Sequence, residues 1–259
     1  MERLSHTVRT ADGVTVDIAC YRNGCRESAL IVCPGFFQSK DTATFTRLSE
    51  ALAAKHLDVV AMDFRGHGRS GGRYTFSARE GADLTAVLAW AAARYARLGV
   101  LGFSLGAAIA INTATQHPGR IQSLIAVSAP SSFEQIEFKC WTPEAMRTGL
   151  QGLERGAGCR PGNLLLKKAR PIESLATLAG LPVLFVHGSR DVIIAEAHSH
   201  RLYAAAREPK RLEIVAGGSH AEALFRDEPD RFLDVIHQWL LQTLPPSGVP
   251  ASSGDSPAS

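Results

Sequence analysis

The sequence predicts an α/β fold in which a mostly parallel sheet carries helices on both faces. Short apolar segments alternate with segments of helical periodicity along the 259 residues. Alternating strand and helix units of this kind build parallel sheets covered by helices. The chain shows no internal repeat, and its hydrophobic content of 45% is sufficient for one large core. We therefore expect a single domain over residues 1–244.

Most of the expected strands are short and apolar. Residues 15–21 alternate apolar and polar side chains, as a half-buried antiparallel strand does, and Asn23-Gly24 marks a turn after them. Residues 29–33 form a fully apolar run, which is typical of a buried central strand. The remaining expected strands are residues 58–64, 98–103, 123–128, 182–187 and 211–215.

Helical periodicity occupies most of the intervals between these strands. Residues 78–95 repeat apolar side chains at positions i, i+3, i+4 and i+7, and residues 45–56 and 105–116 are also expected to be helical. Asp227 and Glu228 suit the beginning of a final helix, where negative charge is favourable. The apolar stripe of that helix is Phe232, Val235, Ile236, Trp239 and Leu240.

Two segments interrupt the alternation. Residues 131–171, approximately, contain no clear strand, and we interpret them as a short lid inserted between two core strands. Residues 245–259 are rich in Pro, Ser, Gly and Ala and cannot bury a hydrophobic face, so we expect a disordered tail.

Charge and hydropathy argue against several classes of function. The formal net charge is +3, with acidic and basic residues interspersed, so no basic stripe predicts a nucleic-acid partner. No apolar run reaches the length of a transmembrane helix. The first residues also lack the apolar stretch of a secretory signal.

The cysteines favour a reducing, cytoplasmic compartment. Their number is odd, they are scattered, and none forms a C-x-x-C pair, so neither a disulfide framework nor a zinc site is expected. One alternative stays open, a disulfide bridge between Cys20 and Cys25 across the turn at Asn23-Gly24. The five are Cys20, Cys25, Cys33, Cys140 and Cys159.

Ser104 occupies a strand–turn–helix context that suits a nucleophile. Gly102-Phe103-Ser104-Leu105-Gly106 ends one expected strand and opens the helix at 105–116. A G-x-S-x-G elbow exposes the serine oxygen at the carboxyl edge of a sheet and needs glycines where side chains would collide. The N–H group of Leu105 can then serve as an oxyanion donor. The alternative is a glycine-rich turn whose serine only caps the helix.

Asp191 and His220 are the expected partners of this serine. A hydroxyl needs a base to remove its proton, and the base works best when a third group orients it. Asp191 follows the expected strand 182–187, and His220 follows strand 211–215. The carboxyl ends of parallel strands meet at one edge of the sheet, where open α/β folds place their sites.

Together these segments resemble the α/β-hydrolase superfamily, especially its small serine esterases and lipase-like members with a short lid. The order Ser104, Asp191, His220 is the order of that superfamily. The resemblance covers about residues 10–244 and implies a small-molecule acyl substrate, no cofactor and no metal, and it leaves the oligomeric state open. It is carried by Pro34-Gly35-Phe36, the segments 63–70, 102–106 and 187–191, and Gly218-Ser219-His220.

The resemblance also implies a second oxyanion donor, the backbone N–H of Phe36. Relatives usually carry His-Gly where this chain has Pro34-Gly35. The departure removes a side chain that often braces this loop, but it leaves the backbone donor in place. Loss of one such donor typically costs about a hundredfold or more in rate, so its placement matters.

Competing residues have other interpretations. Asp63 also follows a strand, but the segment after it resembles a structural turn beside the oxyanion loop of the superfamily. His67 lies upstream of the serine, and hydrogen bonding within that turn is its expected role. His187 is expected to be a packed, hydrogen-bonded core histidine. His198 and His200 are two positions apart on an expected helix and face different sides, which makes a poor metal pair.

Two aromatic residues of the expected lid are candidates for the substrate pocket. Phe133 and Trp141 could line an acyl pocket, and they could equally anchor the lid to the body. The expected reaction is hydrolysis of a carboxylic ester through an acyl-enzyme. Alternatives on the same triad are thioester, amide (such as a peptide N-terminus) or carbon–carbon hydrolysis. A non-catalytic ligand-binding role on the same fold is a further alternative.

Overall fold

One eight-stranded sheet organises the chain in the order β1-β2-β4-β3-β5-β6-β7-β8. This computed structural model describes residues 1–24, 27–55, 57–134 and 154–244. β1 pairs with β2 and β2 with β4 in antiparallel fashion, whereas every pairing from β4 to β8 is parallel. The strands are β1 (Glu2–Arg9), β2 (Thr15–Arg22), β3 (Ser28–Cys33), β4 (Asp58–Met62), β5 (Arg97–Phe103), β6 (Ser123–Val127), β7 (Val183–Gly188) and β8 (Lys210–Val215).

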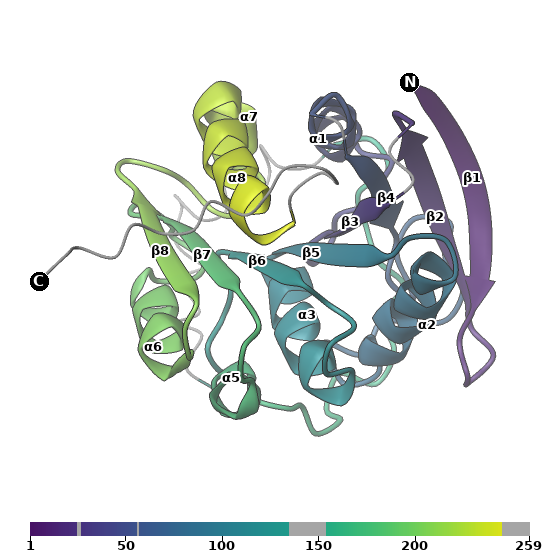
Figure 1. The fold of residues 1–259 in the computed structure, drawn as a ribbon. Coiled ribbons are helices and arrows are strands. Elements are labelled where there is room, and N and C mark those ends of the chain that lie inside the picture. Colours follow the sequence, from purple (N-terminus) through teal and green to yellow (C-terminus); the bar gives the residue numbers. More distant parts are fainter. Residues whose placement is uncertain (25–26, 56, 135–153, 245–259) are drawn as a thin grey trace, which may run out of the picture.

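Helices cover both faces of the sheet, as Figure 1 shows. α1, α7 and α8 lie on one face, and α2, α3, α5 and α6 lie on the other. The helices are α1 (Ala43–Ala53), α2 (Gly81–Ala92), α3 (Leu105–Gln116), α5 (Pro171–Thr177), α6 (Ala197–Ala205), α7 (Ala223–Asp227) and α8 (Pro229–Thr243). In the described part of the chain, no helix combines the length and apolar character needed to cross a bilayer.

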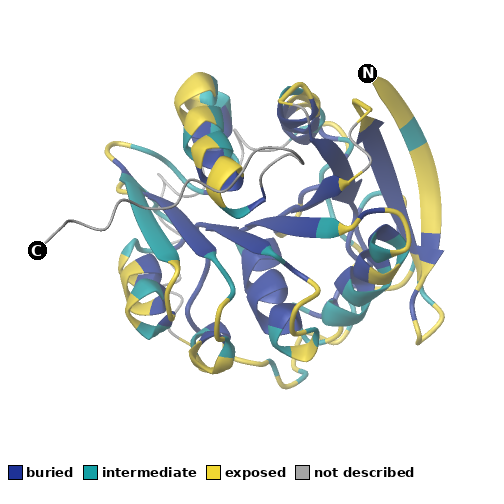
Figure 2. Cartoon of the chain, in the orientation of Figure 1, coloured by how far each residue is buried: buried dark blue, intermediate teal, exposed yellow. Residues whose placement is uncertain are grey.

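The sheet separates two hydrophobic cores, and its central strands are buried on both sides (Figure 2). One core packs α2 and α3 against the sheet, and the other packs α1 and α8. Every residue of β3, β4 and β6 is buried, which explains why each strand is apolar after its first residue. This scaffold fixes the carboxyl ends of β3, β5, β7 and β8 along one edge.

The expected α/β architecture is confirmed, and the differences have local causes. β1 was not predicted as a separate strand because it lies at the exposed edge and pairs through its backbone, so it needs little apolar sequence. α2 begins at Gly81 instead of residue 78. Phe76 and Ser77 adopt positive φ angles of 56° and 77°, which a helix does not allow. The Glu80 carboxylate accepts the Thr75 N–H at 2.6 Å and so holds residues 75–80 as a loop before the helix.

Part of the expected lid and the whole expected tail lie outside the described residues. Residues 154–170, which are described, form turns and isolated bridges before α5 begins at Pro171. Cys20, Cys33 and Cys159 are free thiols, so Cys20 forms no bridge to Cys25. Cys25 and Cys140 themselves lie outside the described residues.

Candidate active site

Ser104 sits at the apex of a tight turn between β5 and α3. Its backbone adopts φ 50° and ψ −116°, a strained conformation for a residue that is not glycine. A Cβ atom on Gly102 would lie 2.6 Å from the Ala107 Cα, and one on Gly106 would overlap the carbonyl oxygens of Cys33 and Pro34. Both glycines are therefore required by close backbone approach, as the elbow motif demands.

Ser104, His220 and Asp191 form a continuous chain of hydrogen-bonding atoms. The Ser104 Oγ lies 3.0 Å from the His220 Nε2, and the His220 Nδ1 lies 2.6 Å from the Asp191 Oδ2. Asp191 follows β7 and His220 follows β8, so three loops at one edge of the sheet bring these groups together. In this arrangement Nδ1–H donates to the carboxylate, which leaves Nε2 as the acceptor for the serine hydroxyl.

Asp191 is a buried carboxylate that is held in its ionised form. Burial alone would raise its pKa, but the neighbouring His220 charge and the hydrogen bonds from His187 and His220 outweigh burial, so the pKa lies well below the ordinary value. The Oδ1 atom also accepts the N–H groups of Ile193 at 2.9 Å and Ile194 at 2.8 Å. These bonds fix the carboxylate in position and charge.

The pKa of His220 is shifted upwards. Burial disfavours the imidazolium, but attraction to Asp191 and the hydrogen bond between them outweigh it, and Glu222 adds to the shift. The net effect is a raised pKa for a side chain that is only 12% exposed. A stabilised imidazolium is what a general base requires once it has accepted a proton.

The loop after β3 passes directly over the serine. A Cβ atom on Gly35 would lie 3.3 Å from both the Phe103 carbonyl oxygen and the Ser104 Cβ. Among the described residues, the backbone N–H groups of Phe36 and Leu105 have no hydrogen-bond acceptor. Two donors are thus available on the segments that flank the serine oxygen, as an oxyanion site needs.

Three residues that the sequence did not single out support the histidine loop. Ser128, at φ 49° just after β6, accepts the Ala221 N–H at 3.0 Å. Glu222, two positions after His220, accepts a 2.7 Å hydrogen bond from the Gln38 Nε2. The second bond joins the loop after β3 to the loop after β8. In the sequence these three residues are marked only by their positions, which lie close to a strand end or to His220.

Aromatic rings adjoin the oxyanion loop. The Phe36 ring stacks on Tyr74 at 5.1 Å between centroids, and 44% of the Phe36 residue is exposed. Phe76 lies 6.3 Å from Phe36 and 5.6 Å from Phe133. Phe133 therefore joins this aromatic group, which we call the Phe36–Phe133 cluster (Phe36, Tyr74, Phe76 and Phe133). Trp141, the other pocket candidate, lies outside the described residues.

The competing residues Asp63, His67 and His198 bond to groups outside the proposed triad. Asp63 bonds to Ser39 and Lys40, and the His67 Nδ1 faces the Arg65 carbonyl at 3.2 Å. His198 is buried and contacts Ser131, whereas His200 is exposed on the same helix, α6. The two histidines therefore do not converge on one ligand position.

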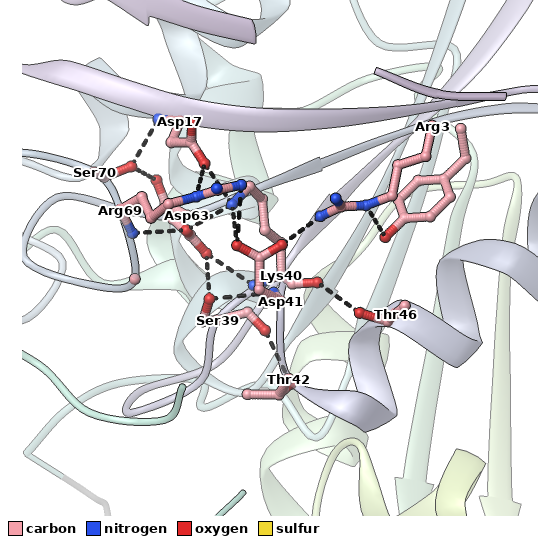
Figure 3. Close-up of polar contacts among 12 residues, drawn as sticks. Arg3, Asp17, Ser39, Lys40, Asp41, Thr42, Thr46, Asp63, Arg69 and Ser70 are labelled. Atoms are coloured by element: carbon pink, nitrogen blue, oxygen red, sulfur yellow. Dashed lines mark hydrogen bonds and ion pairs between the residues drawn. The ribbon is translucent and has the colours of Figure 1, made fainter. Parts of the chain in front are cut away.

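A buried lysine occupies the centre of an acidic group near the same edge. The carboxylates of Asp17, Asp41 and Asp63 lie within 4.8 Å of one another, which is close enough for a metal ion. The fully buried Lys40 ammonium lies between them, at 2.5 Å, 2.8 Å and 3.0 Å respectively (Figure 3). The ammonium thus supplies the positive charge that such a group of carboxylates requires.

Comparison with known proteins identifies relatives of this architecture. A family model described as alpha/beta hydrolase fold matches residues 28–155. The protein Rv2307c of Mycobacterium tuberculosis is 31% identical over 244 residues, a match that covers 91% of this chain and 78% of the relative. An AB hydrolase superfamily protein of Gibberella zeae is 25% identical over 245 residues, covering 86% and 83%.

Solved structures share the fold at lower sequence identity. The Pyrococcus furiosus esterase Pf2001 superposes with a TM-score of 0.75 at 21% identity, and the match covers 94% of this chain and 93% of that one. At such identity the likeness concerns the fold, because one fold hosts many activities. The chemistry has to be argued from the site itself.

Proposed function

Because the chain belongs to the α/β-hydrolase superfamily, we propose that it is a serine hydrolase that cleaves carboxylic esters. The observation that carries the proposal is the unbroken contact chain from the Ser104 Oγ through His220 to Asp191, at 3.0 Å and 2.6 Å. A serine in this setting has a base within hydrogen-bond reach and a carboxylate that orients the base.

Acylation begins when the Ser104 oxygen attacks the ester carbonyl carbon. The His220 Nε2 accepts the hydroxyl proton, and Asp191 stabilises the resulting imidazolium. The carbonyl oxygen becomes an oxyanion that accepts hydrogen bonds from the N–H groups of Phe36 and Leu105. As the tetrahedral intermediate collapses, the carbon–oxygen bond to the alcohol breaks, and His220 returns its proton to the leaving alcohol.

Deacylation repeats these steps with water as the nucleophile. The neutral His220 accepts a proton from water, whose oxygen attacks the acyl carbon of the Ser104 ester. The second tetrahedral intermediate collapses to release the carboxylic acid, and the proton on His220 returns to the serine oxygen. Every proton is carried by His220, so the cycle needs no group besides the substrate, water and this chain.

The substrate proposed is a small ester with an apolar acyl or alkoxy group. The Phe36–Phe133 cluster provides apolar surface beside the oxyanion loop, where such a group can lie. The esterase Pf2001, which has the same fold, is consistent with this substrate class.

Hydrolysis of p-nitrophenyl esters of increasing acyl length tests the proposal. The wild-type protein should release p-nitrophenol and should be labelled by a fluorophosphonate, whereas Ser104→Ala should lose both properties. Thr115→Ala, a hydroxyl deletion on α3 distant from the triad, is the matched control and should retain both. Retained turnover in Ser104→Ala would contradict the serine mechanism. Cleavage of a thioester or an amide in preference to the matched ester would contradict the proposed bond.

We further propose a reducing, cytoplasmic compartment for this activity. Cys20 and Cys33 are buried free thiols, and burial raises the pKa of Cys20 to about 12. Buried neutral thiols of this kind contribute to packing and do not need disulfide formation for stability.

A further inference from the structure

We propose that His67 is a positioning residue that holds the oxyanion loop through the backbone N–H of Phe37. The proposal rests on the serine hydrolase function proposed above. It assigns to the turn at residues 63–70 a direct part in orienting the Phe36 N–H group.

The imidazole of His67 bridges two loops. Its Nε2 lies 3.3 Å from the Phe37 backbone nitrogen, and its Nδ1 lies 3.2 Å from the Arg65 carbonyl oxygen. A backbone N–H can only donate, and a carbonyl can only accept. His67 is therefore neutral with its hydrogen on Nδ1, so Nε2 accepts the Phe37 N–H and Nδ1–H donates to Arg65.

The surroundings of His67 favour this neutral form. The side chain is only 2% exposed, and burial lowers its pKa more than the nearby Asp63 and Glu80 carboxylates raise it. The ring also packs edge-on against Tyr74 at 4.8 Å between centroids. Protonation would place an N–H against the Phe37 N–H, and the low pKa opposes that state.

Phe37 is the residue at which the oxyanion loop needs support. It adopts φ 68°, a left-handed conformation that is unfavourable for a bulky residue. Its carbonyl oxygen accepts the Gly158 N–H at 2.7 Å, and its N–H donates to His67, so both of its backbone groups are engaged. The peptide group between Phe36 and Phe37 is thereby fixed. The Phe36 N–H belongs to the preceding peptide group, across the Phe36 Cα, so its direction is fixed as well.

A second contact ties the same turn to the far end of the loop, as Figure 3 shows. The Asp63 Oδ1 accepts the Ser39 hydroxyl at 2.9 Å and the Lys40 N–H at 2.8 Å. The Asp63 Oδ2 accepts the Arg69 N–H at 3.2 Å within the turn. The loop is thus held at Phe37 by His67 and at residues 39–40 by Asp63.

The first residues of the loop cannot make this contact themselves. Pro34 has no polar side chain, and a side chain on Gly35 would press against Ser104. The imidazole that holds Phe37 comes from a different loop, 30 residues further along the chain.

Two conservative substitutions separate the two hydrogen bonds of His67. In His67→Gln the amide can reach the place of Nε2 and accept the Phe37 N–H, but it loses the Arg65 contact. In His67→Asn the shorter amide keeps the Arg65 contact and loses Phe37. We expect His67→Asn to lower kcat by about 10–100-fold with KM nearly unchanged, because misplacing one oxyanion donor costs transition-state binding.

The kinetics and labelling of the same two variants can also contradict the proposal. His67→Gln should retain kcat within about threefold, and fluorophosphonate labelling should slow in His67→Asn in parallel with kcat, since the phosphoryl oxygen occupies the oxyanion site. Wild-type kcat in His67→Asn, or a larger loss in His67→Gln than in His67→Asn, would overturn the proposal. A wild-type protein that neither hydrolyses esters nor labels would instead overturn the proposed function.

A measurement on the unmodified protein covers the case in which the variants do not fold. Two-bond ¹H–¹⁵N correlation spectra of the ¹⁵N-labelled chain distinguish the two neutral histidine tautomers. At neutral pH His67 should show a protonated Nδ1 and an unprotonated Nε2. An Nε2–H tautomer or an imidazolium at this position would refute the proposed bond to Phe37.

Discussion

The imidazole Nε2 of His187 lies 3.2 Å from the Asp191 Oδ2, the same oxygen that faces His220. Nε2 also lies 2.8 Å from the Ile194 carbonyl oxygen, which can only accept, so Nε2 carries the hydrogen and Nδ1 accepts from the Ser199 hydroxyl at 2.6 Å. His187 was expected to be only a packed, hydrogen-bonded core histidine. It is fully buried as expected: its Nε2–H donates to the Ile194 carbonyl oxygen and at the same time faces the carboxylate of the proposed triad.

We predict that His187→Ala lowers kcat about tenfold. The substitution removes the N–H that bonds to the Ile194 carbonyl oxygen and faces the Asp191 carboxylate. This frees the loop that carries Asp191 and weakens the hold of the carboxylate on His220. Kinetics with p-nitrophenyl acetate would measure this loss. Ser199→Ala, which removes only the remote Nδ1 contact, is the control and should lower kcat less. Equal kcat in the wild type and a folded His187→Ala would show that His187 has no part in orienting Asp191.

The raised pKa of His220 predicts a distinctive pH profile. A general base must be neutral to accept a proton, so kcat/KM should fall as the pH drops through the His220 pKa. Asp191 and Glu222 both favour the imidazolium, so the midpoint should lie above the 6.5 of an ordinary histidine.

Glu222→Gln tests the cause of that shift. It removes one negative charge while the new amide can still accept the Gln38 hydrogen bond. The midpoint should move to lower pH, because the imidazolium loses one favourable charge. Glu213→Gln, on β8 and paired with Arg211, should leave it unchanged. A midpoint that stays fixed in Glu222→Gln would mean that Glu222 does not act on His220.

The chain order Ser104, Asp191, His220 was predictable because each residue follows a recognisable strand. Parallel strands deliver their carboxyl ends to one edge, so the contact between the three residues followed from the strand assignments. The bracing contacts were not predictable in this way. The bond from Phe37 to His67 joins two irregular loops, and nothing in periodicity or spacing marks which loop residues meet.

Buried charge was equally invisible in the sequence. Lys40 stands in a polar segment and would ordinarily be assigned to the surface, yet it is fully buried among three carboxylates. Its environment depends on β2, β4 and their loops folding together. β1 was missed for a related reason, since an exposed edge strand is specified by its partner's backbone more than by its own side chains.

Lys40→Met should strongly destabilise the fold. It leaves Asp17, Asp41 and Asp63 close together without the ammonium, and breaking a buried ion pair typically costs about 3–5 kcal/mol of unfolding free energy. Chemical denaturation would measure the loss. Lys55→Met, the same change at an exposed lysine after α1, is the control and should alter stability by less than about 0.5 kcal/mol.

The effect of Lys40→Met should also depend on pH. Burial would raise the pKa of Asp41, but Lys40, Arg69 and Arg3 outweigh it and hold the pKa below its ordinary value of 3.8. A carboxyl group whose pKa is lower in the folded than in the unfolded state stabilises the fold at pH values above its unfolded-state pKa. That stability is lost as the pH falls through its folded-state pKa. The difference between wild type and variant should therefore shrink below the ordinary aspartate pKa. A constant difference down to pH 2–3, approximately, would contradict the electrostatic cause.

Gly106→Ala should lower kcat by about a hundredfold, because it displaces the elbow. Its Cβ would collide with the backbone of Cys33 and Pro34, which begin the oxyanion loop, so the loop or α3 must move. Gly71→Ala is the matched control, because its nearest contact would be an ordinary 3.5 Å to the Thr15 carbonyl oxygen. Displacement by about 1 Å typically costs about a hundredfold in rate. A Gly106→Ala variant with wild-type kcat would show that the elbow tolerates a side chain there.

The Phe36–Phe133 cluster should set the preferred acyl length. Phe76→Ala removes a ring that lies between Phe36 and Phe133 and opens space beside the oxyanion loop. The value of kcat/KM for an octanoate ester should rise relative to that for an acetate ester. The rise should be about tenfold for each 1.4 kcal/mol by which added apolar contact favours the longer acyl group. Phe225→Ala, a ring of the opposite core that packs on Phe232, is the control and should change stability without changing that ratio. If the ratio is unchanged in Phe76→Ala, the acyl group binds elsewhere. A ring in contact with the acyl chain of the substrate must influence which acyl lengths are accepted.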